Sequence, residues 1–376
     1  MRILFFHNGA DLYGAGRSLF RLATRLVADG HSVRVLLPLQ GPLEQALREG
    51  GVSITVDPSL PVITRRAAQQ GRGRLESCLA LPAFLRRLRK TLHAYRPQLL
   101  HSNVSVLHAS ALAARLSGIP HVWHIRETYV EFPVLWRLYR RWMAWGSDRI
   151  VAISDSVARQ FTPRTRRRKV HIIHNGYPSR EFEGIDPRHV HDFRQRFGLG
   201  DALVVGLAGR IKLVRKGQEI LVEAAHRLRT RHPHVRFVIV GSPFPGNEDH
   251  AARLDAMIHD LGLERQVVCT GEAEDIKAAL SALDVSVICS RVPEPFGGVV
   301  AESMALGKPV VGTTTGGPAE QIEDGVTGLL VPPGDPAQLA AALDRLLSDA
   351  DLRRRMGAAG RQRFERHFEF EIFYDR

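Results

Sequence analysis

Two carboxylates and a pair of glycines lie in the stretch 294–307, where an apolar run is followed by a helical pattern. Glycines at the start of a helix let backbone amides approach a ligand, and those amides are unpaired donors with a positive dipole behind them. A diphosphate would bind well there. Glu294 and Glu302 would flank it and accept hydrogen bonds from hydroxyl groups of a sugar and a ribose. The alternative is a helix whose acidic residues only complement its dipole. The candidate residues are Glu294, Phe296, Gly297, Gly298, Val299 and Glu302.

A cationic group precedes this stretch in the same half of the chain. Gly209 and Arg210 follow an apolar strand-like run, and Lys216 stands just before the next helical pattern. Side chains at the carboxyl ends of parallel strands face the crevice where α/β proteins bind ligands. Arg210 and Lys216 would there neutralise a departing diphosphate, and Arg215 is a neighbouring candidate. Solvated cations are common, so Arg210 and Lys216 alone would be a weak signal. Their occurrence in the same half as a glycine-rich anion site favours a binding site.

The elements that must position these residues alternate along the whole chain. Short β-branched or aliphatic runs without strict alternation are each followed by a helical pattern, which indicates parallel sheets covered on both faces. Two such series predict two doubly wound α/β domains. The predicted strands of the first half are 3–7, 32–37, 52–56, 98–102, 121–125, 149–153 and 170–173. Those of the second half are 203–208, 235–240, 266–270, 285–289, 309–312 and 328–331.

The boundary between the halves is predicted just after the Asn-Gly and Pro cluster at 174–178, which is followed by a polar stretch rich in turn formers. We therefore expect an N-terminal domain at 1–180 and a C-terminal domain at 181–358. Residues 359–376 are expected to form a helix that packs back on the N-terminal domain. A length of 376 residues agrees with two domains.

Composition excludes several classes of protein. No run of about 18 uncharged apolar residues exists, so no membrane-spanning helix is predicted. The N-terminal apolar run is too short for a signal peptide and is interpreted as a buried strand. Cys78, Cys269 and Cys289 are too scattered for a disulfide framework or a metal site, and the last two are expected to be buried thiols. A cytoplasmic protein without a metal is the expectation.

The formal net charge of +13 agrees with a nucleic acid, an anionic membrane or a polyanionic substrate as partner. Between Thr64 and Lys90 there are eight cations, one acidic residue and interleaved leucines. Such a helix could lie on anionic lipid, or it could be a solvated helix whose apolar stripe packs into the first domain. Both interpretations stay open. For a second basic segment, Phe132 to Trp145, internal packing is favoured.

Together these motifs resemble the family-4 retaining glycosyltransferases of GT-B fold. The resemblance rests on Gly209-Arg210 and Lys216-Gly217, combined with Glu294-x-Phe296-Gly297-(x)₄-Glu302. It extends through Gly316-Gly317-Pro318-Ala319-Glu320 and, in the first half, through Gly14-Ala15-Gly16 and His124-Ile125-Arg126-Glu127. Five residues separate Arg210 from Lys216, where four are commoner in the family. Either Arg215 or Lys216 could therefore occupy the cationic position.

The resemblance implies two Rossmann-like domains that face each other across a cleft, with the acceptor on the first and a nucleoside-diphosphate sugar on the second. It implies Glu302 on the ribose, Glu294 on the transferred sugar and the 296–299 amides on the diphosphate, with Arg210 and Lys216 beside them. From the first domain, His124 would contact the donor sugar or its reacting region. The loop glycines and alanine Gly14, Ala15 and Gly16 would approach the donor when the cleft closes. No metal and no further cofactor is expected.

The predicted function is transfer of a sugar, of the hexosyltransferase type and with retention, to a glycan or lipid-linked acceptor in cell-envelope or exopolysaccharide biosynthesis. The protein would act in the cytoplasm, with peripheral contact at the inner face of an anionic membrane as an added expectation. One alternative is a nucleotide-sugar epimerase or hydrolase of the same fold. A basic nucleic-acid-binding protein is disfavoured because no recognised nucleic-acid module is present. An NAD site is disfavoured because Leu19 replaces the third glycine of the fingerprint.

Overall fold

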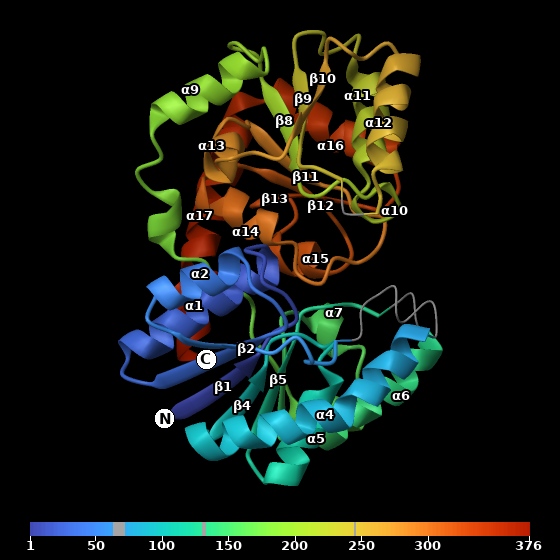
Figure 1. Ribbon diagram of the computed structural model, residues 1–376. Helices are drawn as coiled ribbons and strands as arrows, with labels where there is room; N and C mark the ends of the chain where they lie inside the picture. The colour runs from blue at the N-terminus through green and yellow to red at the C-terminus, as the bar shows by residue number, and fades with distance from the viewer. Residues whose placement is uncertain (63–71, 130–132, 244–245) are drawn as a thin grey trace. The chain divides into compact units, whose positions relative to one another are not determined.

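The computed structural model describes residues 1–62, 72–129, 133–243 and 246–376 (Figure 1). The chain forms two compact units, Met1–Ile173 and His174–Arg376. Part of the basic segment 64–90 falls at 63–71, outside the described residues, and only the helical backbone is described for residues 72–80. Among the helices that the structure describes, none combines the length and apolar character needed to cross a membrane.

The first unit is built on a seven-stranded sheet with the order β3-β2-β1-β4-β5-β6-β7, in which all pairs are parallel. Its strands are β1 (Arg2–Phe6), β2 (Ser32–Leu37), β3 (Ser53–Val56), β4 (Leu99–Ser102), β5 (His121–Ile125), β6 (Arg149–Ala152) and β7 (Val170–Ile172). Its helices include α1 (Gly14–Ala28), α2 (Pro42–Glu49), α4 (Arg72–Tyr95), α5 (His108–Ser117), α6 (Pro133–Gly146), α7 (Asp155–Ala158) and α8 (Pro163–Lys169).

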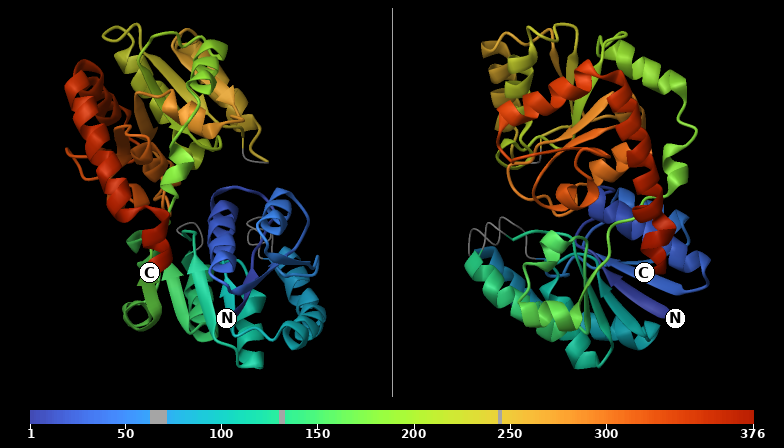
Figure 2. Two further views of the ribbon diagram at one scale, coloured as in Figure 1. Left: turned by 90° about the vertical axis from the view of Figure 1, so that its left-hand side faces the viewer. Right: turned by 180° about the vertical axis from the view of Figure 1, so that it is seen from behind.

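Strand β1 shows why this sheet is covered on both faces. Successive side chains of a strand point to opposite faces. Ile3 and Phe5 pack in a cluster with residues of α1 and α2, whereas Leu4 and Phe6 pack with residues of α4 and α5. In Figures 1 and 2 these helix pairs lie on opposite sides of the sheet. The apolar run at residues 3–6 is therefore continuous because both of its faces are buried.

The second unit is built on a six-stranded parallel sheet with the order β10-β9-β8-β11-β12-β13. Its strands are β8 (Val204–Ala208), β9 (Arg236–Val240), β10 (Val267–Gly271), β11 (Val285–Ile288), β12 (Val310–Thr313) and β13 (Gly328–Val331). The helical elements are η1 (Ser179–Phe182), α9 (Pro187–Arg196), α10 (Leu213–Lys216), α11 (Gln218–Leu228), α12 (Asp249–Asp260), α13 (Ile276–Ser281), α14 (Gly298–Ala305), α15 (Gly317–Gln321), α16 (Pro336–Ser348), α17 (Ala350–His367) and α18 (Phe370–Asp375).

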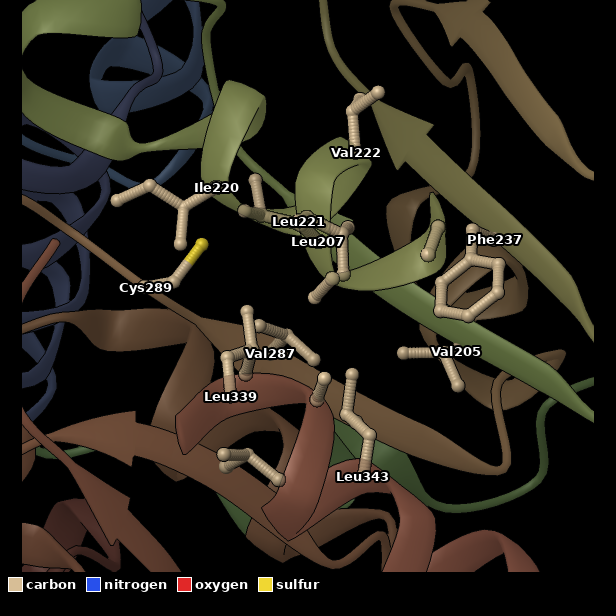
Figure 3. Close-up of a cluster of buried hydrophobic side chains, with 14 of the residues drawn as sticks. Val205, Leu207, Ile220, Leu221, Val222, Phe237, Val287, Cys289, Leu339 and Leu343 are labelled. Atoms are coloured by element: carbon tan, nitrogen blue, oxygen red, sulfur yellow. The ribbon is translucent and has the colours of Figure 1, made fainter. Parts of the chain in front are cut away.

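Both faces of this sheet are covered as well. Val205 and Leu207 of β8 join a buried cluster with side chains of α11 and α16, as Figure 3 shows, while Val204 and Ala208 pack against α13 on the other face. Cys289 lies in the first cluster (Figure 3), and burial raises the pKa of its thiol to about 12. Cys269 is only partly buried, and burial raises its pKa to about 11. The prediction of two doubly wound parallel sheets is confirmed in every predicted strand.

The C-terminal end of the chain belongs to the second unit. The amide of Tyr177 donates to the carbonyl of Phe368 (2.9 Å), and a Cβ added to Gly176 would lie 2.5 Å from Cβ of Phe373. Helix α17 runs without a break across residue 358, which was the predicted end of the second domain. Packing of residues 359–376 on the first unit stays a prediction.

Candidate functional site

Three loops meet at the carboxyl edge of the sheet of the second unit, after β8, β11 and β12. The ammonium of Lys216, at the end of α10, lies 2.8 Å from Oε1 of Glu294 in the loop after β11. Ser290, the second residue after β11, donates from Oγ to the same carboxylate oxygen (2.8 Å). The amide of Gly317, the first residue of α15 after β12, donates to the Glu294 carbonyl (2.9 Å). The carboxylate and the cation that the sequence placed at two strand ends are thus in direct contact.

Glu294 is almost completely buried, with 7% of its surface exposed. Burial alone would raise the pKa of its carboxyl group. The positive charge of Lys216, hydrogen bonds from Lys216 and Ser290, and the charge of Arg215 outweigh burial, so the pKa lies below the ordinary value for glutamate. Glu294 is therefore ionised at neutral pH and acts only as a hydrogen-bond acceptor.

The loop from Phe296 to Gly298 is held close to the loop after β12 by glycines. Gly297 has φ +78°, a left-handed conformation that glycine adopts without a steric penalty. A Cβ added to Gly316 would lie 2.5 Å from the carbonyl oxygen of Glu294, and one added to Gly317 would lie 2.1 Å from that of Phe296. The two backbones could not approach in this way with any other residue at these positions.

Helix α14 begins at this edge and carries Glu302 about one turn beyond its first residue, Gly298. Glu302 is partly buried, as is Val299 in the first turn. A buried glutamine, Gln321, steadies the start of the helix because its side-chain amide donates to the Phe296 carbonyl. The N-terminus of α14 thus faces the same edge as Glu294 and Lys216, which is the geometry expected for an anion site.

Arg210 and Arg215 are two further cations of the segment after β8. Arg210 directly follows Gly209 after β8, and its carbonyl accepts a hydrogen bond from Gln218 of α11 (3.1 Å). The carbonyl of Arg215 accepts from the amide of Arg291 (2.8 Å), which ties the loop after β8 to the loop after β11. Lys216 forms an ion pair with Glu294, and the charge of Arg215 also lowers the pKa of Glu294.

In the first unit, Gly14, Ala15 and Gly16 form the first turn of α1 instead of the predicted loop, and the two glycines differ in their surroundings. A Cβ on Gly16 would lie 2.1 Å from the carbonyl oxygen of Asp11, so packing alone explains that glycine. No atom lies within 4 Å of a Cβ placed on Gly14, the first residue of α1, so packing does not explain it. The carbonyl of Ala15 accepts a hydrogen bond from the side chain of Asn103 (3.1 Å).

His124 lies in β5, 2% exposed, with Nδ1 3.3 Å from Nη2 of Arg126. Burial lowers the pKa of His124 well below its ordinary value, and the nearby charge of Arg126 adds to this effect. The imidazole is therefore neutral at pH 7. His124 and residues 14–16 belong to the first unit, and the other candidate residues belong to the second.

Sequence reasoning did not select several buried polar residues at these edges. In the second unit they are Ser290 and Gln321, and in the first unit they are His7, Asn103 and Arg126. His7 and Asn103 directly follow β1 and β4, and Ser290 is the second residue after β11. A polar residue immediately after a buried strand was therefore the signal that could have found them. Within the described ranges, no three His, Cys, Asp or Glu side chains gather in a way that could hold a metal ion.

Two family models match the chain, one in each half. The model described as Glycosyltransferase Family 4 matches residues 13–180, and the model described as Glycosyl transferases group 1 matches residues 191–363.

Curated relatives match parts of the chain. It is 38% identical over 167 residues to the alpha-D-kanosaminyltransferase of Streptomyces kanamyceticus, which covers 44% of this chain and 42% of the relative. It is 31% identical over 230 residues to the lipopolysaccharide core biosynthesis glycosyltransferase LpsE of Rhizobium meliloti, which covers 61% of this chain and 63% of the relative. The matches thus span less than two thirds of the length of these relatives.

A solved structure covers the whole chain. The structure of HepE from Anabaena in complex with UDP superposes with a TM-score of 0.83 at 25% identity, covering 100% of this chain and 98% of HepE. Matches in both halves, and a fold shared over the full length, lead to one conclusion: the chain belongs to the group 1 glycosyltransferases of family 4 and has the GT-B fold.

Proposed function

We propose that the protein is a retaining glycosyltransferase that moves a sugar from a nucleoside-diphosphate sugar to a glycan or lipid-linked acceptor. The observation that carries the proposal is the contact between Lys216, Glu294 and Ser290 beside the start of α14. A cation, an ionised carboxylate and a helix N-terminus at one sheet edge suit a ligand that joins a diphosphate to a sugar. HepE, which shares the fold, is known in complexes with UDP and with UDP-glucose.

In the proposed reaction, the protein contributes position and charge. The bond between the anomeric carbon and the diphosphate oxygen breaks, and a bond from that carbon to the acceptor oxygen forms on the same face. The proton of the acceptor hydroxyl passes to the departing diphosphate. Arg210 and Lys216 stabilise the negative charge that develops, together with Arg215 and the amides at 296–299. Glu294 and Glu302 orient the sugar and the ribose by accepting hydrogen bonds.

Contributions from the first unit are part of the proposal. His124 contacts the donor sugar or its reacting region, and Gly14 to Gly16 approach the donor. The open space around a Cβ on Gly14 supports a role for this glycine other than packing. No metal takes part. The acceptor belongs to cell-envelope or exopolysaccharide synthesis, as the name of the relative LpsE suggests for that protein.

The test is nucleotide release from a panel of UDP-, GDP-, ADP- and dTDP-sugars, compared between wild type and the variants Glu302→Ala and Arg210→Ala. Glu264→Ala and Arg265→Ala are matched controls, because both residues are exposed in the turn before β10. We expect slow release from one donor class, lost in the two site variants and kept in the two controls. Release that survives in Glu302→Ala and Arg210→Ala would contradict the site. Full turnover without any acceptor would favour the epimerase or hydrolase.

The proposal includes peripheral contact of the first unit with the inner face of an anionic membrane. In the described part of α4, Phe84 and Leu88 are buried, whereas Arg86, Arg89 and Lys90 are exposed. The apolar stripe therefore packs internally, and the basic face remains outside. This packing agrees with the second interpretation of the basic segment, and contact of its exposed basic face with lipid stays a proposal.

A groove between α4 and α5 supports this contact. Its volume is about 840 Å³, and none of the described residues lining it is acidic. Leu85, Leu92 and Leu116 form part of its apolar surface, and the guanidinium groups of Arg86, Arg89 and Arg96 are the cations of its lining. Arg96 directly follows α4 and has φ 50°, a conformation in which glycine is usual, so the chain keeps a cation there at a backbone cost.

Co-sedimentation with vesicles tests this part of the proposal. Each cation near an anionic surface contributes about 1 kcal/mol. We therefore expect the double variant Arg86→Glu/Arg89→Glu to bind vesicles rich in anionic lipid at least about tenfold more weakly than wild type. Arg253→Glu/Arg265→Glu changes two exposed cations of the second unit and serves as the control for net charge. Binding of wild type that does not depend on the anionic lipid content would refute the contact.

A further inference from the structure

Four buried polar residues form one connected cluster at the carboxyl edge of the sheet of the first unit. His7 follows β1, Asn103 follows β4, His124 lies in β5 and Arg126 follows it. These three strands are neighbours in the sheet, in the order β1-β4-β5. The residues are 3%, 0%, 2% and 8% exposed, respectively. Hydrogen bonds inside such a cluster must match donors to acceptors, because water does not compensate a mismatch.

Arg126 decides the orientation of Asn103. A guanidinium group carries N–H donors and no acceptor. Its Nε lies 3.3 Å and its Nη2 3.2 Å from Oδ1 of Asn103, and Nε also donates to the Asn103 carbonyl (3.1 Å). The amide oxygen of Asn103 must therefore face Arg126. This orientation leaves Nδ2 of Asn103 to donate to the carbonyl of Ala15 (3.1 Å) and to Nδ1 of His7 (3.3 Å).

The same argument assigns the hydrogen on both histidines. Nδ1 of His124 lies 3.3 Å from Nη2 of Arg126, and Nδ1 of His7 lies 3.3 Å from the amide nitrogen of Asn103. Each Nδ1 faces a group that can only donate, so each must accept with its lone pair. A neutral imidazole carries one hydrogen, which must then be on Nε2.

Both imidazoles are neutral at pH 7. Burial lowers the pKa of His7 to about 3, and the charge of Arg126 adds to the effect. Burial and the same charge lower the pKa of His124 as well. A hydrogen on Nδ1 of His124 would point at a cation, so the charged form is disfavoured twice.

We propose that Arg126 is a positioning residue that holds His7 and His124 as neutral Nε2–H tautomers, directly for His124 and through Asn103 for His7. His124 then has no nitrogen able to take a proton: the lone pair of Nδ1 faces Arg126, and Nε2 already carries a hydrogen. Given the proposed function, His124 acts on a sugar hydroxyl as a hydrogen-bond donor and does not act as a general base. This agrees with a reaction in which the departing diphosphate accepts the proton of the acceptor.

Nitrogen NMR of the ¹⁵N-histidine-labelled protein reads the tautomers without any donor sugar. His121 is an internal reference, because its Nδ1 lies 2.7 Å from the Gly146 carbonyl and must carry the hydrogen. We expect the Nε2–H pattern for His7 and His124 and the Nδ1–H pattern for His121, unchanged between about pH 6 and pH 8. The variants His7→Gln, His121→Gln and His124→Gln assign the signals. An Nδ1–H pattern or mixed tautomers for His124 in wild type would overturn the proposal.

Three variants test the role of Arg126. In Arg126→Met, both histidines should lose the fixed pattern and titrate at a higher pH than in wild type, while an unchanged His121 shows that the fold is kept. In Asn103→Leu, the tautomer pattern of His7 should change, and those of His124 and His121 should stay as in wild type. Arg126→Lys should restore the Nε2–H pattern of His124, because an ammonium group, like a guanidinium group, can only donate hydrogen bonds. Patterns of His7 and His124 that survive in Arg126→Met would contradict the assignment.

Turnover separates this proposal from the proposed function. Loss of one oriented donor to the substrate predicts release of nucleotide about tenfold slower in Arg126→Met, with recovery in Arg126→Lys. Nucleotide release by Arg126→Met at the wild-type rate would refute the effect on the reaction. If no donor is turned over by wild type, the proposed function fails, whereas the tautomer assignment is still decided by NMR.

Discussion

The pair of Lys216 and Glu294 predicts an asymmetric loss of stability when either partner is removed. Glu294 is 7% exposed, whereas the side chain of Lys216 is 35% exposed. Lys216→Met therefore leaves a buried carboxylate without its ion-pair partner. Glu294→Gln leaves an ammonium group without its partner, but this group is still accessible to water. Removal of one partner of a fully buried pair costs about 3–5 kcal/mol. Ser290 still donates to Glu294, so we expect about 2 kcal/mol for Lys216→Met. Glu294→Gln should cost below about 1 kcal/mol.

The positions of the tryptophans allow the stability of each unit to be measured separately. All four, Trp123, Trp136, Trp142 and Trp145, belong to the first unit, and the altered pair belongs to the second. Two units need not unfold in one transition. Unfolding in urea followed by tryptophan fluorescence reports the first unit, and circular dichroism reports both. We expect both variants to shift the transition seen only by circular dichroism and to leave the fluorescence transition in place.

The pH dependence gives a second check of the same reasoning. In wild type the pKa of Glu294 lies below its ordinary value, so its contribution to stability is complete above the unfolded pKa and is lost as the pH falls through the folded one. In Lys216→Met, burial should prevail and raise this pKa, so the deficit of the variant should shrink between about pH 7 and pH 4. Equal losses for the two variants, or a deficit of Lys216→Met that grows on acidification, would refute the argument.

Three further predictions follow from close contacts and burial. Gly317→Ala should lower the stability of the second unit by about 1–3 kcal/mol, measured by urea unfolding, because its Cβ would lie 2.1 Å from a backbone oxygen. Gly16→Ala should lower the fluorescence-detected midpoint for the same reason, whereas Gly14→Ala should leave it unchanged and reduce only nucleotide release. Cys289 should not react with a thiol reagent until the protein unfolds, because burial raises its pKa to about 12; rapid labelling of the native protein at this residue would contradict the packing.

The sequence by itself determined the succession of strands and helices. A parallel strand covered on both faces is continuously apolar, as at Val204–Ala208, and that pattern is local. The glycines at the start of a helix were also predicted locally, and the structure shows Gly297 as the N-cap of α14. Lys216 and Glu294 were predicted at one site because ligands bind at the carboxyl ends of parallel strands, a rule that requires only the order of elements.

Only the tertiary structure decided which polar atoms face each other. Asn103 and Arg126 come from different strands, and no spacing along the chain indicates that the guanidinium group would orient the amide. The approach of the loop at Gly317 to the loop at Phe296 depends likewise on how two strands pair. Hydrogen bonds depend on tenths of an ångström and on direction, and those quantities are set when distant segments pack together, whereas the apolar pattern of a strand is carried by neighbouring residues.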